Sequence, residues 1–394
     1  MKLLEWTYTE KAQQMKGWTL GVLVLISCLG TNAQNMRLID SKATPQTRAL
    51  FLNLARLSSK HTFFGHQHAT EYGHGWYGKE NTSDVKSVVG SHPAVIGVDI
   101  SGFSGRPEDE IRNNMQALRK NVQDTYNRGG VTTISWHFSN PVSEGGFYWV
   151  DSVSKPAVKY IIPGGGAHSQ YKEILSRIAS WANSLRGADG NAVPVIFRPY
   201  HEFDGNWFWW GKAHCTTDEF KTLWKFTVSY LRDSLDVHNF IYAFSPDNKF
   251  NSESEFLERY PGDEWVDMVG MDNYGDMGRD RYAIDVAASK LKIISDYAEK
   301  AGKLAAFTET GLESIPNPQW WSGTLLKTMR LHKMKLCYVL VWRNDVKSET
   351  HYYAPFPGHT PSIPDFKKFY DDPYTLFEAD LKDVYRLKEK GSNK

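Results

Sequence analysis

Residues 197–211, which read FRPYHEFDGNWFWWG, decide how the rest of the chain is interpreted. They continue the short apolar run 193–196, which is typical of a buried parallel strand. The strand is followed by a carboxylate, Glu202, and then by a loop with three tryptophans. A barrel enzyme that acts on a sugar presents its catalytic acid in this way. Taken alone, Glu202 could equally be an ordinary acid beside an aromatic cluster, so the other segments must decide.

Eight apolar runs of strand length follow one another, and segments of helical period lie between them. The predicted strands are residues 62–65, 94–100, 131–137, 193–200, 240–244, 266–271, 304–307 and 336–341. The predicted helices are residues 47–57, 83–89, 107–128, 169–186, 217–235, 252–260, 284–300, 319–332, 365–370 and 374–388. This alternation predicts an α/β fold, a (β/α)8 TIM barrel in a single domain. A doubly wound sheet is the alternative, but no GxGxxG motif, which such a sheet often carries, follows the first strand.

Composition narrows the class of function. The chain has 394 residues and a formal net charge of +1, so nothing suggests a nucleic acid as partner. Fourteen tryptophans and twenty tyrosines are a high number; buried aromatics explain many of them, but the excess also suits a protein that stacks rings against sugars. The three cysteines show neither a disulfide framework nor CxxC spacing, and we expect no metal and no cofactor. We also expect a monomer without a stable membrane span.

The N-terminal segment has the order of a secretory signal. Lys16 precedes the apolar run 20–26, and small residues follow as far as Ala33. The run is too short for a permanent transmembrane helix. We therefore predict a signal peptide at residues 1–33, a catalytic domain at residues 34–394, and export to the periplasm or the exterior. Met15 is the better start for such a signal, so residues 1–14 could be an over-extended start. Residues 25–28 also resemble a lipoprotein box, which would anchor the chain at Cys28.

Polar or aromatic residues end seven of the eight predicted strands. In chain order they are His66, Gln67 and His68; Asp99; Trp136 and His137; Arg198, His201 and Glu202; Asp272, Asn273 and Tyr274; Glu309; and Trp342, Arg343, Asn344 and Asp345. The strands of a barrel end at one rim, where loops build the active site. Stability does not explain this repetition, so it predicts a site at that rim.

Glu202 and Glu309 have the positions that glycoside hydrolysis requires. One carboxylic acid protonates the leaving oxygen, and a second carboxylate faces it across the sugar. Strands four and seven lie on roughly opposite sides of a barrel mouth, so the two side chains can face each other. Glu309 could alternatively be a structural partner of Arg198 or Arg343, and such a pair would also keep a nucleophile ionised. Tyr274 is placed to donate a hydrogen bond to this carboxylate.

Three motifs together are similar to a known family. Residues 198–211, the run FTETG at 307–311 and the run WRND at 342–345 resemble glycoside hydrolase family 26, the mannan endo-1,4-β-mannosidases. The resemblance extends from about residue 63 to about residue 345. Its most specific part is His-Glu-Phe-Asp-Gly-Asn-Trp, because most related barrel glycosidases carry Asn-Glu at the fourth strand.

The resemblance implies retaining hydrolysis of mannan, galactomannan or glucomannan, with Glu202 as acid/base and Glu309 as nucleophile. Xylan or mixed-linkage glucan stays open as the substrate. The implied substrate-binding residues are His137, Trp149, Arg198, His201, Trp207, Tyr274, Trp342 and Arg343, with Trp149 stacking on a sugar. The long loop at residues 140–168 is expected to form one wall of the cleft.

Two other classes of function fit the sequence less well. A non-catalytic sugar-binding barrel would keep the aromatic residues and lose one carboxylate, whereas both Glu202 and Glu309 are present. A phosphate-using barrel would need a glycine-rich site after strands seven and eight. The chain has bulky Trp320, Trp321 and Trp342 near those positions instead.

Overall fold

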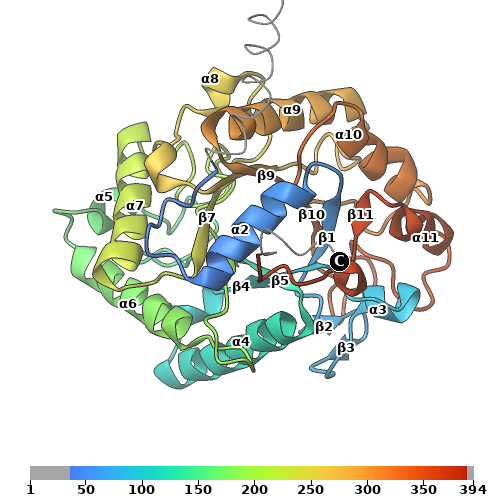
Figure 1. Cartoon of the computed structure of the whole chain (residues 1–394). Coiled ribbons are helices and arrows are strands. Elements are labelled where there is room, and N and C mark those ends of the chain that lie inside the picture. The colour runs from blue at the N-terminus through green and yellow to red at the C-terminus, as the bar shows by residue number, and fades with distance from the viewer. Residues whose placement is uncertain (1–35, 388–394) are drawn as a thin grey trace, which may run out of the picture. The chain divides into compact units, whose positions relative to one another are not determined.

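Eight parallel strands close into a barrel in the computed structural model, which describes residues 36–387 (Figure 1). The strands pair in chain order, and the last returns to the first with Phe63 opposite Tyr338. They are β1 (Thr62–Gln67), β4 (Val95–Asp99), β5 (Val131–Trp136), β6 (Val195–Pro199), β7 (Phe240–Phe244), β8 (Met268–Asp272), β9 (Leu304–Thr310) and β10 (Tyr338–Val341). The predicted fold and all eight predicted strands are confirmed. The predicted signal peptide lies outside the described residues.

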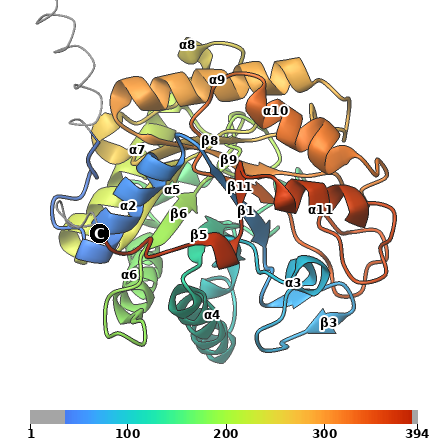
Figure 2. The same ribbon diagram turned by 45° about the vertical axis from the view of Figure 1, so that its right-hand side comes forward.

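Most of the helices surround the barrel between successive strands, while the first precedes β1 and the last follows β10 (Figure 2). They are α2 (Pro45–Leu57), α3 (Asp84–Val89), α4 (Glu108–Arg128), α5 (Val158–Ile161), α6 (His168–Ser184), α7 (Thr217–Ser229), α8 (Glu253–Phe256), α9 (Ile284–Ala301), α10 (Lys327–Arg330) and α11 (Ile363–Asp371). The predicted helix at 217–235 ends in a π-helical turn, Tyr230–Ser234, and the one at 319–332 begins with another, Trp321–Leu326. No helix within residues 36–387 is long and apolar enough to cross a membrane.

Helix α2 closes the end of the barrel at which the strands begin (Figure 1). Thr44 caps the helix, since its hydroxyl accepts a hydrogen bond from the Thr47 amide, and Pro45 starts the first turn. The Thr44 amide donates to the His238 carbonyl, just before β7. The Ile39 amide donates to Asp267, just before β8, at 2.8 Å. Loops form the opposite rim, where the strands end.

The predicted helix at 374–388 is wrong within its described part. The chain there forms the short strand β11 (Thr375–Leu376) and a 3-10 turn, Glu378–Asp380. Strand β1 pairs with β4 only from Gly65 onward, so the backbone of Thr62 and Phe63 needs another partner at that edge. Strand β11 supplies it, with Thr62 opposite Thr375. Phe377 is then fully buried against Phe64, with ring centroids 5.0 Å apart. This tertiary packing overrides the helical pattern.

The tryptophans are mostly core residues. Seven are among the largest fully buried side chains: Trp136, Trp181, Trp209, Trp210, Trp224, Trp320 and Trp321. Two of the three tryptophans in the loop after Glu202 belong to this group. Trp209 donates to the Phe138 carbonyl at 2.6 Å, and Trp210 donates to the His201 carbonyl at 2.8 Å. Most of the tryptophans that the structure describes therefore pack the core, and Trp209 and Trp210 also hold the rim loops in place.

Candidate active site

The backbone after β6 is bent so that Glu202 faces the barrel mouth. Tyr200 and Glu202 have φ angles of 51° and 54°, in the left-handed region that side chains other than glycine rarely adopt. The Glu202 amide donates to the Ser245 carbonyl at 3.0 Å, which ties the bend to the end of β7. The buried Tyr200 hydroxyl contacts Tyr171 and Thr227 behind the strand. The surrounding structure thus holds a costly conformation, as is common at functional sites.

Glu202 has the properties of a carboxylic acid that keeps its proton. It is partly buried, and the indole of Trp207 donates a 2.6 Å hydrogen bond to its Oε2. Burial raises the pKa of Glu202 well above its ordinary value, and the charges of Asp272, Glu309 and Asp247 raise it further. The bond from Trp207 opposes this rise. A carboxyl group with a raised pKa can donate a proton at near-neutral pH.

Glu309 is held as a hydrogen-bonded carboxylate at the end of β9. The Tyr274 hydroxyl donates to its Oε1 at 2.7 Å, and Arg198 donates to its Oε2 at 2.6 Å. Only 5% of the residue is exposed. Both predicted contacts, the one from Tyr274 and the ion pair with Arg198, are therefore present. Arg343 pairs instead with Asp345, at 2.6 Å.

Arg198 joins two buried carboxylates beneath the mouth. Its second nitrogen donates to Asp272 at 2.6 Å, and Thr308 donates to the other oxygen of Asp272 at 2.7 Å. Burial disfavours the charge on Arg198, but Asp272 and Glu309 outweigh it and raise the pKa of the guanidinium. These contacts hold Glu309 in position. It makes Arg198 a supporting group under the carboxylate.

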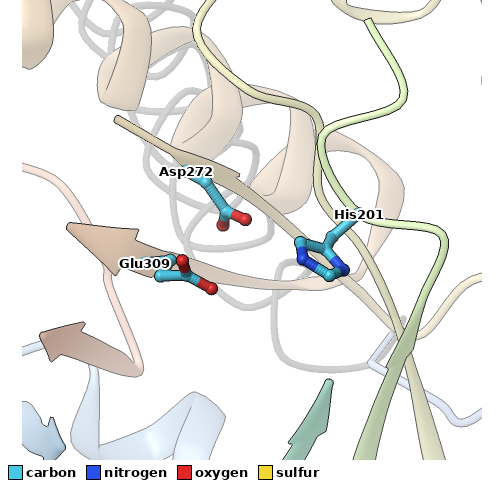
Figure 3. Close-up of side chains that lie close together, drawn as sticks. All are labelled: His201, Asp272 and Glu309. Carbon is cyan, nitrogen blue, oxygen red and sulfur yellow. The ribbon is translucent and has the colours of Figure 1, made fainter. Parts of the chain in front are cut away.

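His201, Asp272 and Glu309 face one another closely enough to suggest a cation site (Figure 3). One possible ligand atom from each lies within 4.8 Å of the others. However, Arg198 already donates to both carboxylates and supplies the positive charge that they need. Burial, Arg198 and His137 lower the pKa of His201, so this imidazole is neutral. Arg198 therefore supplies the positive charge that a bound cation would otherwise bring to this group.

A second group of predicted residues meets around His137. Its Nδ1 is hydrogen-bonded to Asp99 at 2.7 Å. Burial alone would raise the pKa of Asp99, but His137 reverses the effect and holds it well below its usual range. The His137 ring lies 4.7 Å from that of His201 and 5.8 Å from that of Trp342. Residues from β5, β6 and β10 thus converge, as their strand-end positions predict.

The loop at 140–168 is joined to the loop that carries Glu202. The Trp149 amide donates to the Trp207 carbonyl at 2.7 Å, and the Trp209 amide donates to the Phe147 carbonyl at 3.3 Å. The ring of Trp149 stacks on His214, with centroids 3.7 Å apart and planes at 10°. One face of this predicted sugar-stacking ring is therefore covered. The described contacts place Trp149 beside Trp207, but not against either glutamate.

Sequence reasoning gave no role to two side chains near the glutamates. Burial raises the pKa of Tyr148, and the charges of Glu202 and Glu309 add to this effect. Asp247 follows β7, the one strand for which no polar end was predicted, and its charge acts on Glu202. The run Ser245-Pro246-Asp247 was the available signal, because it comes directly after the apolar strand.

Comparison with known proteins identifies the family. Residues 39–376 match the sequence profile of glycosyl hydrolase family 26. The chain belongs to this family. It is 37% identical over 297 residues to a mannan endo-1,4-β-mannosidase of Bifidobacterium adolescentis, a match that covers 71% of this chain and 28% of that longer protein. Hence the chain spans less than a third of the length of this relative.

Two solved structures of family 26 proteins resemble the whole barrel. GH26C from Muricauda has a TM-score of 0.83 and 38% sequence identity, covering 91% of this chain and 97% of its own. The β-mannanase BoMan26A from Bacteroides ovatus has a TM-score of 0.81 and 40% identity, covering 88% of this chain and 98% of its own. The resemblance found in the three motifs is confirmed, and the chain is a glycoside hydrolase.

Proposed function

We propose that this chain is a mannan endo-1,4-β-mannosidase, which hydrolyses β-1,4-mannosidic bonds in mannan, galactomannan or glucomannan with retention of configuration. The observation that carries the proposal is the different environment of two glutamates at one rim. Glu202 has a raised pKa, whereas Glu309 accepts hydrogen bonds from Arg198 and Tyr274. The Bifidobacterium and Bacteroides relatives are named as mannanases, which supports mannan as the substrate.

The environments divide the chemistry between the two residues. Glu202 donates its proton to the glycosidic oxygen while a Glu309 oxygen attacks the anomeric carbon, which forms a covalent glycosyl-enzyme and releases the leaving sugar. Glu202, now ionised, removes a proton from water, and the water displaces Glu309. Retention requires carboxyl groups about 5–5.5 Å apart, and a separation of roughly 9 Å would indicate inversion. Arg198 and Tyr274 orient Glu309 through their hydrogen bonds to it.

Kinetics with an aryl β-mannobioside would test this division of roles. Glu309→Ala removes the nucleophile, so activity should fall by about 10⁴-fold or more on every substrate. Glu202→Ala should still release an acidic phenol in a burst, because this leaving group needs little protonation. Turnover should then be slow, and azide should rescue it as a β-linked azide product. The same behaviour in both variants, or exchanged behaviour, would contradict the assignment.

The substrate is tested separately by product analysis. We expect the wild-type chain to release oligosaccharides from galactomannan and glucomannan, and little or nothing from xylan or mixed-linkage glucan. If xylan or mixed-linkage glucan were hydrolysed faster, that polysaccharide would replace mannan as the proposed substrate. The assignment of the catalytic pair would be unchanged. Loss of all hydrolysis, with binding retained, would favour the non-catalytic sugar-binding alternative.

We also propose that the chain is exported and is a monomer. The order of charged, apolar and small residues in 1–33 supports export with cleavage before Gln34. Mass spectrometry of the mature chain should find Gln34 at its N-terminus, whereas a diacylated Cys28 would mean a lipoprotein. Light scattering should give the mass of one chain, and a dimer mass would overturn the monomer proposal.

A further inference from the structure

A short hairpin after β1 carries a row of stacked rings. Its strands are β2 (Tyr72–Gly73) and β3 (Trp76–Tyr77), which pair antiparallel. The ring of His68 stacks on Tyr72 with centroids 5.0 Å apart and planes at 23°. Tyr72 in turn stacks parallel to Tyr77, with centroids 6.3 Å apart and planes at 10°. Tyr77, the outermost ring, is 76% exposed. We call these three residues the aromatic ladder.

The hairpin is held firmly, although it lies at the surface. Asp84, at the start of α3 and only 2% exposed, accepts a 2.7 Å bond from the Trp76 indole and a 2.8 Å bond from the His74 amide. It accepts a third bond from Asn344, also at 2.8 Å. A side chain at Gly73 would lie 2.4 Å from Asp84, so the turn and α3 are in close contact. The ladder is therefore preorganised rather than a mobile loop.

The inner end of the aromatic ladder lies at the rim that carries the catalytic groups. His68 directly follows β1, and the Gly75 amide donates to the Val346 carbonyl, in the loop after β10, at 3.2 Å. Burial raises the pKa of Tyr72, and the opposing cause is Arg343, a predicted substrate-binding residue. The charge of Asp99, the partner of His137, also acts on Tyr72. The rings thus lead from the sugar site outward, past Tyr72 to Tyr77.

The exposed ring of Tyr77 contributes little to the stability of the fold. A tyrosine that is 76% exposed buries too little surface to stabilise the fold substantially. The residues that follow it, Gly78, Lys79 and Glu80, are all exposed and two of them are charged, so this segment is not a wide apolar patch of the kind that binds another protein. A single rigid ring in polar surroundings, continuous with a sugar site, suits a flat ligand with one apolar face and hydroxyl groups at its edge.

We propose that the aromatic ladder is an outer sugar-binding site of this enzyme. Tyr77 receives the C–H face of a hexose unit of the mannan chain, beyond the sugars that contact Glu202 and Glu309. The ladder adds affinity for long substrates and contributes nothing to the chemical step. This inference rests on the proposed function, since it names where a longer part of the same substrate binds.

The test compares long and short substrates in Tyr77→Ala. For mannohexaose, KM should rise about three- to ten-fold with kcat unchanged, because one stacking contact of ordinary strength is lost. For an aryl β-mannobioside, which is too short to reach the ladder, both constants should equal those of the wild type. Tyr77→Trp, which keeps a flat ring, should retain the wild-type KM on the hexasaccharide.

Leu52→Ala is the control. Leu52 is 36% exposed and lies on α2, which closes the end of the barrel opposite the catalytic rim (Figure 1), so this change should alter KM and kcat for neither substrate. An unchanged KM for mannohexaose in Tyr77→Ala would overturn the ladder proposal, and so would an equal loss on both substrates. A wild-type enzyme inactive on mannohexaose would instead overturn the proposed function, which separates the two failures.

Discussion

At the scale of single residues, the raised pKa of Glu202 depends on burial and on side chains from other parts of the barrel. After burial, the causes that raise its pKa are Asp272 on β8, Glu309 on β9 and Asp247 after β7. Asp247 is itself only 2% exposed, and its nearest cation is Lys249 at 3.5 Å. The amides of Asp247 and Lys249 both donate to Asp204, so the loop that carries Asp247 is fixed to the loop that carries Glu202.

Asp247→Asn should therefore move the alkaline limb of the pH–activity profile to lower pH. Glu202 must be protonated to act as an acid, so activity falls as pH rises through its pKa. Removing one negative charge makes ionisation of Glu202 easier and therefore lowers this pKa. The pH dependence of kcat/KM would measure the shift.

The control for this variant is Asp218→Asn, which makes the same chemical change at the exposed start of α7. Its profile should coincide with that of the wild type. An alkaline limb of Asp247→Asn that stays in place, or that moves to higher pH, would show that the raised pKa of Glu202 has its origin elsewhere.

Arg198 should be essential for stability as well as for activity. In Arg198→Met, Asp272 and Glu309 lose their shared cation, and unpaired buried charges typically cost about 3–5 kcal/mol. Burial already raises the pKa of Asp272, and without Arg198 the main group that lowers it is gone, so the folded variant binds a proton there that the unfolded chain has already lost. Stability must consequently fall as pH increases above about 4. Urea unfolding at pH 5 and pH 8 should show the larger loss at pH 8.

Arg198→Met/Asp272→Asn supplies the comparison, because it removes one of the two unpaired charges. It should recover part of the free energy of unfolding at pH 8 and little at pH 5. A loss in Arg198→Met that does not depend on pH would mean that packing, rather than charge, makes this residue important.

Single residues were predictable where strand position alone defines their role. Glu202, Glu309 and Arg198 end strands, and in a parallel barrel this fact brings them to one rim. The effect of Asp247 was not predictable, because it depends on how the loop after β7 approaches the loop after β6. The stacking of His214 on Trp149 was not predictable for the same reason, since residues 149 and 214 meet only through the folded loops.

At the scale of elements, the buried strands were the easiest to predict. A run such as Phe240–Phe244 is apolar throughout and fully buried, so its pattern and its environment agree. The hairpin of β2 and β3 was missed because two-residue strands show no periodicity. The helix predicted at 374–388 failed because Tyr374 to Phe377 pack as an edge strand on β1, a contact that no local pattern records.

The start of α7 offers a test of local stabilisation. Thr216 and Glu219 form a capping box, in which the Glu219 amide donates to the Thr216 hydroxyl at 3.2 Å and the Thr216 amide donates to the Glu219 carboxylate at 2.8 Å. Thr216→Ala should lower the free energy of unfolding by about 1 kcal/mol, with kcat unchanged. Thr222→Ala, on the exposed face of the same helix, should change stability by less than about 0.5 kcal/mol. Equal losses in the two variants would contradict a capping role.

At the scale of the whole molecule, the barrel is completed by contacts between distant parts of the chain. Strand β10 closes on β1, and β11 then covers the edge of β1 that β4 leaves unpaired. Glu378, just after β11, makes two further contacts. Its amide donates to the His92 carbonyl, and its carboxylate pairs with Arg128 at 3.1 Å. One short segment therefore ties together β1, the approach to β4 and the end of α4.

Phe377 is the apolar centre of this closure. It is fully buried, and its ring packs on Phe64 from β1 and on Tyr370 from α11, with centroids 5.0 Å and 4.7 Å away. Phe377→Ala should lower the free energy of unfolding by about 3–5 kcal/mol, because a cavity opens between elements that cannot collapse onto it. Unfolding in urea followed by fluorescence would measure this loss.

The catalytic rim lies at the other end of the strands, so folded Phe377→Ala should keep the wild-type kcat at low temperature. Leu331→Ala, at a position that is 40% exposed, is the control and should lose less than about 1 kcal/mol. If Phe377→Ala lost no more unfolding free energy than Leu331→Ala, the C-terminal segment would only cover a barrel that β1 and β10 already close. A large loss together with a changed kcat would instead mean that closure at this end determines the geometry of the opposite rim.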